Sequence, residues 1–335
     1  MNEADFKLTK EITELLKKSG ISIEDIHNTD TLTDSYIDYA KDIDIKKIDF
    51  GFANLNSAIR GLRTQELMTI IAGTGIGKSA LLLNFLMNYT KKTNELTVLF
   101  SLEMSEVGIG ERIFQIEMDR FGFEIENGFI KKDNQFIQEC RELQKSLSNF
   151  IIITKRLDIS NIPEIINVIQ KIRGKKVRLI GVDYIGLMDN VYYRQNEYLR
   201  ITDNMIKLYS YAKTLDVAII NLSQTSRQDV KGNDTGLSLY SAKGSGEIEQ
   251  SSDYVLTLER IQKPNAVEID KINSLQAYNE KHKTELELMK LSIHKNRRGK
   301  SGIIYIIFNR KNLIIEEYNT QKYLTTSFKM PENAF

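Results

Sequence analysis

The strongest chemical pattern in the sequence is a glycine-rich segment that ends in a lysine and a serine, Ala72-Gly73-Thr74-Gly75-Ile76-Gly77-Lys78-Ser79. It follows an apolar run of strand length and opens a run of helix length, the context of a phosphate-binding P-loop with alanine in its first position. In such a loop, backbone N–H groups surround phosphates, the lysine reaches the β- and γ-phosphates, and the serine hydroxyl binds Mg²⁺. The segment predicts a nucleoside triphosphate site formed by Gly73, Thr74, Gly75, Ile76, Gly77, Lys78, Ser79 and Ala80.

Three polar side chains at the ends of predicted strands are candidates for chemistry at that site. Asp183 closes an apolar strand and is predicted to help Ser79 hold Mg²⁺, although an aspartate there is also a common cap or turn residue. Glu103 is predicted to lie beside the P-loop strand and to deprotonate the attacking water, with an exposed loop glutamate as the alternative. Gln224 is placed to sense the γ-phosphate, unless it is an ordinary edge residue.

The only compact basic run is His294-Lys295-Asn296-Arg297-Arg298-Gly299-Lys300. Lys295 and Arg297 lie two residues apart, which would place both on one face of a strand, offered to a γ-phosphate. The alternative is a solvated hairpin edge, because lysine and arginine commonly protect exposed strands. The residues alone leave both interpretations open.

The composition limits the classes of protein that the chain can belong to. Its 335 residues include 46 Lys+Arg and 45 Asp+Glu, a net charge of +1, so any nucleic-acid binding must be local. A hydrophobic content of 41%, with 3 Pro, excludes disordered and collagen-like chains. Cys140 is the only cysteine, no secretory leader pattern is present, and no apolar run approaches ~18 residues. We therefore expect a cytoplasmic protein without membrane association.

The elements that must position the candidate residues alternate between strands and helices from about residue 48. This alternation predicts an α/β fold with a mainly parallel sheet and right-handed crossovers. The predicted strands are 67–72, 97–101, 150–154, 177–182 and 217–223, and the predicted helices lie within 78–92, 105–148, 160–173 and 195–215.

The C-terminal part changes character. Segments 253–258, 288–294, 302–308 and 311–315 are predicted to be strands without long helices between them, the last two forming a hairpin around Asn309-Arg310. The polar segment 261–285 is predicted to be an exposed excursion.

The first fifty residues are of a different kind. A narrow apolar stripe predicts a short helix that ends near Ser19-Gly20, and a polar linker follows it. Because this stripe is too small to form a core, we expect it to pack on an adjacent subunit, with its own domain as the alternative. The predicted organisation is a helical arm and linker over 1–48, one large domain over 49–320 and a tail over 321–335. The stripe consists of Leu8, Ile12, Leu15 and Leu16.

Six segments, taken in order, resemble the bacterial replicative helicase family (DnaB-like) from about Phe50 to Glu316. The resemblance implies a RecA-like ATPase core with a twisted sheet flanked by helices and C-terminal antiparallel strands. It also implies ATP and Mg²⁺ as cofactors, nucleotide contact by Arg112, and a hexameric ring that moves along single-stranded DNA. The segments are AGTGIGKSALLLNFLMN, FSLEMS, LIGVDYIGLM, NLSQTSR, SGEIEQSSDYVLTLER and KNRRGKSG.

The same resemblance implies roles for the catalytic candidates. Glu103 matches the catalytic base, Asp183 the residue that holds Mg²⁺ through water, and Gln224 the residue that couples phosphate state to the DNA-binding loops. Lys295 and Arg297 match residues that act in trans and complete the neighbouring subunit's site. Such an arginine finger is worth ~10³–10⁵ in rate.

For DNA contacts, the resemblance points to a central loop in which this chain has Lys243-Gly244 where the family usually has Arg-Glu. A lysine keeps a phosphate contact and loses the bidentate fork. Additional contacts are expected from exposed cations and from Tyr192 and Tyr193, whose rings can stack on bases. The expected DNA-binding residues are Arg194, Arg227, Lys231, Lys243, Ser245 and Gly246.

About fifty residues stand where the family's replicative members carry a large collar domain, which favours a trimmed helicase of phage or mobile-element type. A helicase loader and a primase are the further partners that the resemblance suggests. Two other classes stay open: a recombinase-like filament, and a regulatory ATPase without DNA activity. A ring rather than a filament, and ATP hydrolysis stimulated by single-stranded DNA, would distinguish the helicase from them.

Overall fold

The computed structural model describes residues 16, 18–20, 26, 28–41, 43, 46–225 and 245–323, and the chain divides into two compact units, 1–46 and 47–335. In the first unit, Gly20 takes φ +72°, the left-handed conformation that suits the end of a helix. Helix α2 (Thr29–Lys41) follows. Of the predicted apolar stripe, only Leu16 lies among the described residues.

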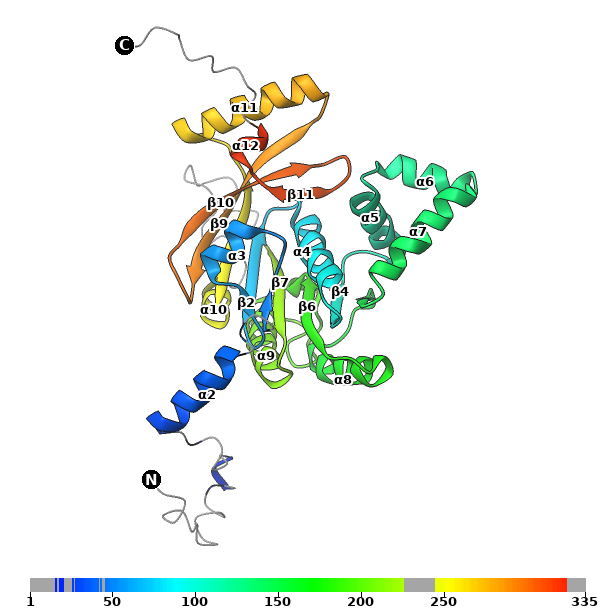
Figure 1. Ribbon diagram of the computed structural model, residues 1–335. Helices are drawn as coiled ribbons and strands as arrows, with labels where there is room; N and C mark the ends of the chain where they lie inside the picture. Colours follow the sequence, from blue (N-terminus) through cyan, green and yellow to red (C-terminus); the bar gives the residue numbers. More distant parts are fainter. Residues whose placement is uncertain are drawn as a thin grey trace, which may run out of the picture. The chain divides into compact units, whose positions relative to one another are not determined.

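In the second unit, the described strands form a nine-stranded sheet with the order β11-β10-β9-β8-β3-β7-β6-β4-β5 (Figure 1). The six strands from β8 to β5 are parallel, and β9, β10 and β11 continue the sheet with antiparallel pairing. A separate antiparallel pair is formed by β1 (Lys47–Ile48) and β2 (Leu62–Arg63). The strands are β3 (Leu67–Ala72), β4 (Leu96–Ser101), β5 (Phe150–Ile153), β6 (Val177–Asp183), β7 (Ala218–Gln224), β8 (Tyr254–Arg260), β9 (Leu286–Asn296), β10 (Gly302–Asn309) and β11 (Ile314–Glu317).

Helices cover both faces of this sheet, because alternate residues of the buried strands point to opposite sides. In β3, Met68 and Ile70 belong to the core under α4, whereas Leu67 and Ile71 belong to the core under α8, α9 and α10. None of the helices in the described ranges combines the length and apolar character needed to span a bilayer. The helices are α3 (Ala53–Ile59), α4 (Lys78–Lys92), α5 (Glu106–Met118), α6 (Gly122–Ile130), α7 (Asn134–Ser146), α8 (Ile162–Arg173), α9 (Glu197–Thr214), α10 (Ser245–Ser251), α11 (Ala266–His282) and α12 (Thr320–Tyr323).

The C-terminal part corrects two expectations. The polar segment predicted as an exposed excursion contains the 17-residue helix α11, so a long helix does separate two of the tail strands. Its few apolar residues pack on β9 and β10 in a small core of Leu275, Leu288, Ile307 and Tyr323. In addition, β8 is parallel to β3 and belongs to the central sheet. The predicted hairpin is confirmed as β10 and β11.

Candidate active site

The register of the parallel strands brings the predicted catalytic residues to one edge of the sheet. Ala72 pairs with Gln224 across β3 and β7, and Ser101 pairs with Asp183 across β4 and β6. Parallel strands end together, and ligands of open α/β sheets bind outside those carboxyl ends. One detail of the prediction is wrong: Glu103 does not follow a strand beside β3, because β7 and β6 separate β3 from β4.

The P-loop has the backbone that a phosphate-binding turn requires. Gly75 and Gly77 adopt φ +73° and +113°, which other L-residues rarely tolerate. A Cβ on Gly77 would also lie 2.8 Å from Cε1 of Phe308. Helix α4 begins at the next residue, Lys78, so the free N–H groups of its first turn face the loop. The segment that follows β3 is therefore shaped to bind an anion.

Lys78 supplies a buried positive charge to this loop. Its side chain is only 7% exposed, and its Nζ lies 3.7 Å from Oε2 of Glu103, whose side chain is 47% exposed. The same Nζ lies 5.4 Å from the ring centroid of Tyr184. A buried ammonium is costly unless it is closely paired, and 3.7 Å is a loose pairing. A bound phosphate would complete the charge balance around Lys78.

Asp183 and Ser79 form the oxygen pair predicted for Mg²⁺. Asp183 is 2% exposed and is hydrogen-bonded to Ser79, while its Oδ1 has no hydrogen-bond partner. Burial raises the pKa of Asp183, against the opposing effects of the Ser79 hydrogen bond and the Lys78 charge. Carboxylate and hydroxyl oxygens suit Mg²⁺, which is usually held by one or two carboxylates, substrate phosphates and water. Among the described residues, no group of three or more His, Cys, Asp or Glu side chains is arranged to hold a metal ion by itself.

Gln224 and Arg112 also reach the site. The Gln224 amide donates a hydrogen bond to the Thr74 hydroxyl, so the end of β7 contacts the P-loop directly. Arg112, on α5, lies close enough for its charge to lower the pKa of Asp183, although burial outweighs this effect. Gln224 therefore contacts the P-loop, and Arg112 lies within electrostatic range of Asp183 at the same edge.

Sequence reasoning missed Arg310, which also contacts the P-loop. Its Nη1 donates to the carbonyl of Gly75 at 3.2 Å, and its guanidinium lies 4.8 Å from the ring centroid of Phe308. Its Nε is held by Glu287 at 2.5 Å. The sequence identified Arg310 only as a turn residue, because its proximity to the loop depends on the antiparallel register of β9 and β10. The contact between Arg310 and the P-loop could be predicted only from the order of the strands in the sheet.

The basic pair lies at the opposite edge of the sheet. Asn296 of β9 pairs with Tyr254 of β8, which in turn pairs with Met68 near the start of β3. The six residues of β3, roughly 20 Å of strand, therefore separate this edge from the P-loop. Lys295 lies within β9, whereas Arg297 lies just beyond its end, so the expectation that both share one strand face is wrong.

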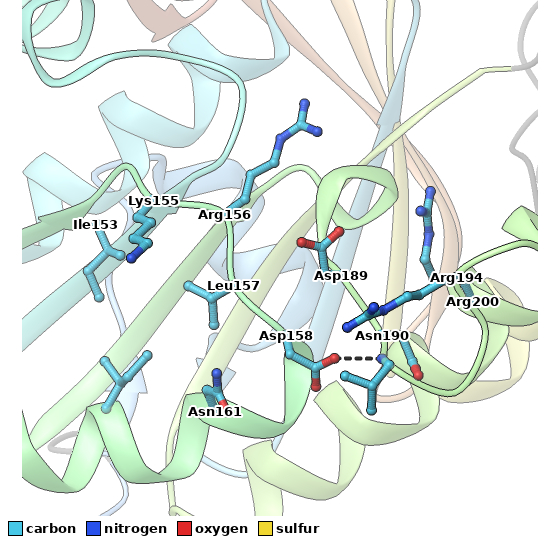
Figure 2. A pocket seen from close by; sticks show the side chains of 12 residues that line it. Ile153, Lys155, Arg156, Leu157, Asp158, Asn161, Asp189, Asn190, Arg194 and Arg200 are labelled. Carbon is cyan, nitrogen blue, oxygen red and sulfur yellow. Dashed lines mark hydrogen bonds between the residues drawn. The ribbon is translucent and has the colours of Figure 1, made fainter.

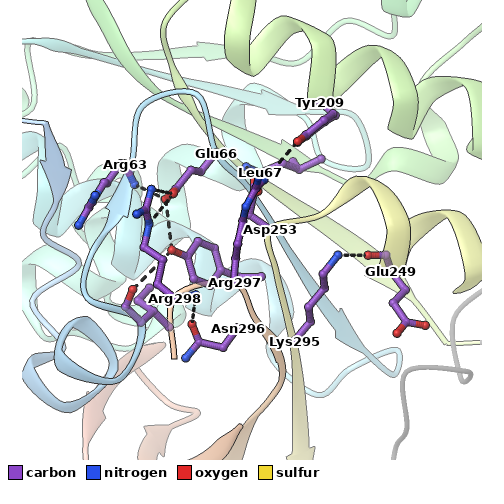
Figure 3. A network of polar contacts seen from close by, with 12 residues as sticks. Arg63, Glu66, Leu67, Tyr209, Glu249, Asp253, Lys295, Asn296, Arg297 and Arg298 are labelled. Carbon is purple, nitrogen blue, oxygen red and sulfur yellow. Dashed lines mark hydrogen bonds and ion pairs between the residues drawn. The ribbon is translucent and has the colours of Figure 1, made fainter. Parts of the chain in front are cut away.

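A hydrogen-bond network fixes Arg297 (Figure 3). Its Nη1 donates to Oδ1 of Asp253 at 2.5 Å and to the hydroxyl of Tyr209 at 3.3 Å, and these bonds raise its pKa above the usual value. Asp253 is 2% exposed, and its Oδ2 accepts from the backbone N–H of Leu67 at 2.9 Å. Arg297 itself is 60% exposed. Nη1 of Arg297 is thus held by the carboxylate of Asp253, which is also bonded to Leu67, the first residue of β3. The rest of the Arg297 side chain is exposed to solvent.

The neighbouring residues fasten the turn after β9. Arg298 pairs with Oε1 of Glu66 at 2.6 Å, and Oε2 of Glu66 accepts from the backbone N–H of Arg63 at 2.9 Å. Lys295 donates to the carbonyl of Glu249. Figure 3 shows Arg63, Glu66 and Arg298 as one group, with Lys295 and Glu249 as a separate pair. Lys295 and Arg298 are therefore tied to neighbouring elements, whereas Arg297 and Lys300 of the same run are exposed.

The predicted DNA-binding residues are only partly described. Arg194 is exposed, in the segment between β6 and α9, and the nearby ring of Tyr192, 77% exposed, lies 5.3 Å from Nζ of Lys207. Ser245 and Gly246 open α10. Arg227, Lys231 and Lys243 lie outside the described residues.

Together, the fold and the P-loop edge define a P-loop nucleotide-binding protein with a RecA-like core. The DnaB-like helicase C terminal domain family matches residues 47–317, and the chain belongs to this family, as the sequence resemblance predicted.

Individual relatives agree. The chain is 30% identical over 275 residues to the replicative DNA helicase DnaB of Mycoplasma genitalium, covering 79% of this chain and 55% of that protein. It is 26% identical over 314 residues to the replicative DNA helicase DnaB of Geobacillus stearothermophilus, covering 92% and 61%. The matched region thus spans little more than half the length of these relatives.

Solved structures show the same fold. A solved ATPase domain matches with a TM-score of 0.71 at 21% identity, covering 88% of this chain and all of that one. A DnaB-like replicative helicase, described with its interactions with primase, matches with a TM-score of 0.70 at 20% identity, covering 92% and 71%. The predicted α/β class with C-terminal antiparallel strands is confirmed.

Proposed function

We propose that this chain is the ATP-hydrolysing motor of a DNA helicase, which forms a ring and moves along single-stranded DNA with each active site shared between two subunits. The observation that carries the proposal is the placement of Lys295 and Arg297. They lie at the amino edge of the sheet, the full length of β3 away from the P-loop of their own chain. A cation placed there serves a phosphate only if a neighbouring subunit presents one.

The residues at the carboxyl edge perform the chemistry within one subunit. Lys78 and the P-loop N–H groups bind the β- and γ-phosphates of ATP, and Ser79 and Asp183 hold Mg²⁺, which neutralises phosphate charge when bound. Glu103, 3.7 Å from Lys78, faces the position of the terminal phosphate and accepts the proton of the attacking water. Gln224, bonded to Thr74, transmits the state of that phosphate to the segment that follows β7.

Lys295 and Arg297 complete the site of the adjacent subunit by stabilising the charge of the transferring phosphoryl group. A hexamer is the ring that we infer from the family. The apolar stripe at the N-terminus would pack on the next subunit and strengthen this contact. The chain would act in the cytoplasm, on DNA held by Arg194, Arg227, Lys231, Lys243, Ser245 and Gly246, with a primase or a helicase loader as further partners.

Mixed rings provide the test. Lys78→Ala removes the cation of a subunit's own site, and Arg297→Ala removes the finger that serves the neighbour, so each variant alone should hydrolyse ATP at least ~10³-fold more slowly. Mixing the two should restore part of the ATPase, because some interfaces then pair an intact P-loop with an intact finger. Complete inactivity at all mixing ratios, with mixed rings verified by native mass spectrometry, would exclude a finger in trans.

Unwinding of a forked duplex tests the motor itself. The parent protein with ATP should separate the strands, and the Lys78→Ala variant should not. Electron microscopy on the same samples should show closed rings. Helical filaments without unwinding would favour a recombinase, and an ATPase that ignores single-stranded DNA would favour a regulatory ATPase.

A further inference from the structure

A cavity of about 700 Å³ lies between the segment that follows β5 and the segment that leads from β6 into α9 (Figure 2). Both segments leave the sheet at its carboxyl edge, yet the cavity has its own lining, without P-loop residues among those described. Four cations and two carboxylates face it, which gives an excess of two positive charges, 4 − 2. These residues are Lys155, Arg156, Arg194 and Arg200, with Asp158 and Asp189.

Asp158 joins the two walls of the cavity. Its Oδ2 accepts from the backbone N–H of Val191 at 2.6 Å, and its Oδ1 accepts from the N–H of Ser160 at 2.9 Å. Burial would raise its pKa, but these hydrogen bonds lower the pKa of Asp158. Two backbone hydrogen bonds, from Ile159 to Asp189 and from Asp189 to Leu157, run beside it. The Asp158 carboxylate therefore ties the two walls together and stays negatively charged, and the four cations of the lining still outnumber the two carboxylates.

The second wall is tied to α9. Asn190, which is buried, donates to Asp203 at 2.6 Å and to Asn204 at 3.0 Å, and Nη2 of Arg200 donates to the carbonyl of Gly186 at 3.0 Å. Nε of Arg200 is buried and has no hydrogen-bond partner. These hydrogen bonds hold the backbone that carries the cations of the cavity. The buried Nε of Arg200 is a hydrogen-bond donor in its wall that has no partner.

The chemistry of the lining points to phosphates and not to a base. Lys155, Arg156 and Arg194 are exposed at the cavity, and no aromatic side chain lines it among the described residues. The exposed ring of Tyr192 stands in the adjoining segment, held beside Lys207. A basic groove for the backbone with an aromatic ring outside it is the arrangement by which proteins bind single-stranded nucleic acid.

We propose that this cavity binds consecutive phosphates of single-stranded DNA, and that Lys155 and Arg156 are DNA-contacting residues that continue the surface of Arg194. The inference rests on the proposed function and deepens it, because it adds the segment after β5 to the DNA path. The sequence analysis did not predict that Lys155 or Arg156 contacts DNA. The feature that could have identified these two residues is a pair of adjacent cations directly after a strand that ends at the ligand-binding edge of the sheet.

The test compares two double variants of the full chain in binding a fluorescein-labelled dT oligonucleotide across a salt series. Lys155→Ala with Arg156→Ala should reduce the salt slope by about 1.4 in log–log units, twice the ~0.7 expected per phosphate contact, and weaken binding roughly ten-fold or more. The matched control removes two exposed lysines of the α6 and α7 region, Lys131→Ala with Lys145→Ala, and should leave both quantities at parental values.

The outcomes separate this inference from the proposed function. A parent that binds no oligonucleotide overturns both. A parent that binds, with an unchanged affinity and slope in the Lys155/Arg156 variant, overturns the inference alone. A third arm measures binding of pyrophosphate in the Lys78→Ala background. If removing Lys155 and Arg156 abolishes pyrophosphate binding but spares DNA binding, the cavity is a site for a small phosphate ligand and the inference is wrong.

Discussion

The two ends of β3 differ in how completely their charges are paired. At the carboxyl end, the buried Lys78 pairs with Glu103 at 3.7 Å, and Oδ1 of Asp183 has no hydrogen-bond partner. At the amino end, Asp253 accepts from Arg297 at 2.5 Å and from the N–H of Leu67 at 2.9 Å. The carboxyl end is electrostatically incomplete and needs a ligand. The amino end is complete and instead holds a cation outward.

This difference has a mechanical consequence. The same strand that leads into the P-loop begins at the residue bonded to Asp253, which holds Arg297. A closely packed strand transmits small displacements because protein interiors are nearly incompressible. In the proposed ring, β3 would therefore link the nucleotide bound by one subunit to Arg297, the finger that we propose for the neighbouring site.

The largest expected effect comes from the incomplete end. Glu103→Gln keeps the shape of the side chain and removes the proposed base, so ATP should still bind while turnover falls about 10³-fold. Lys78→Ala should weaken nucleotide binding as well. Fluorescent nucleotide titration and a phosphate-release assay separate the two effects. Parental turnover in the Glu103→Gln variant would mean that another group deprotonates the water.

The next effect tests the complete end. Asp253→Asn keeps an oxygen to accept from Leu67 but turns an amide toward Arg297, so the finger should lose its orientation while β3 stays in place. We expect kcat to fall about 10–100-fold with unchanged nucleotide affinity. Mixing this variant with Lys78→Ala should restore ATPase as the Arg297→Ala mixture does. Damage to the variant's own nucleotide site or to its fold would not be rescued in this way.

Tyr209→Phe is the matched, weaker variant at the same site. It removes one hydrogen bond of 3.3 Å to Arg297 and leaves the ion pair with Asp253. We expect less than about a three-fold loss of kcat. If Tyr209→Phe were as damaging as Asp253→Asn, the ion pair would not be what orients the finger.

How far the sequence predicted this molecule depends on how local each feature is. The bounds of β3 and α4 match the predicted 67–72 and 78–92, because an apolar run, a glycine turn and a helical run are adjacent in the chain. Helix α11 was missed because its contacts with the sheet depend on a few apolar residues in a polar segment. Local patterns thus predicted the P-loop and most of the elements.

The contacts of the remaining site residues depend on strand order and register. Local patterns in the sequence do not show which strands are neighbours. Glu103 was placed beside the P-loop strand, although two strands intervene. Arg310 and Asp253 were given no role, because the contact of each is made across the antiparallel half of the sheet. The resemblance identified the types of residue at the site, whereas the packing shows which of them touch.

A smaller effect concerns stability at the incomplete end. Burial raises the pKa of Asp183, which means that its charged form is unfavourable in the folded chain without Mg²⁺. Asp183→Asn should therefore raise the free energy of unfolding by about 1–2 kcal/mol above pH 6 while abolishing Mg²⁺-dependent hydrolysis. Urea unfolding with EDTA measures this. The gain should vanish at low pH, where Asp183 is protonated; a destabilised variant would mean that the carboxylate is paired better than its burial suggests.

The smallest effect concerns His294, on the strand that carries Lys295. Its Nε2 shares a hydrogen bond of 2.8 Å with the hydroxyl of Thr257, and burial lowers the pKa of its imidazole despite the opposing charge of Glu259. A histidine whose folded pKa lies below its unfolded value of ~6.5 favours the unfolded chain once it is protonated, so stability is lost as the pH falls through that range.

We therefore expect the parent to lose up to about 1 kcal/mol more unfolding free energy than a His294→Gln variant between pH 7.5 and pH 5.5. Glutamine can still bond to Thr257 but does not titrate, so the two proteins should differ little at pH 7.5. Urea unfolding at both pH values gives the difference. The pH dependence of the unfolding free energy is opposite to that expected from Asp183, whose charged form destabilises the folded chain as the pH rises. Equal pH responses in parent and variant would show that His294 has the same pKa in the folded and the unfolded chain. The contrast between the two ends of β3 would then depend on their ion pairs alone.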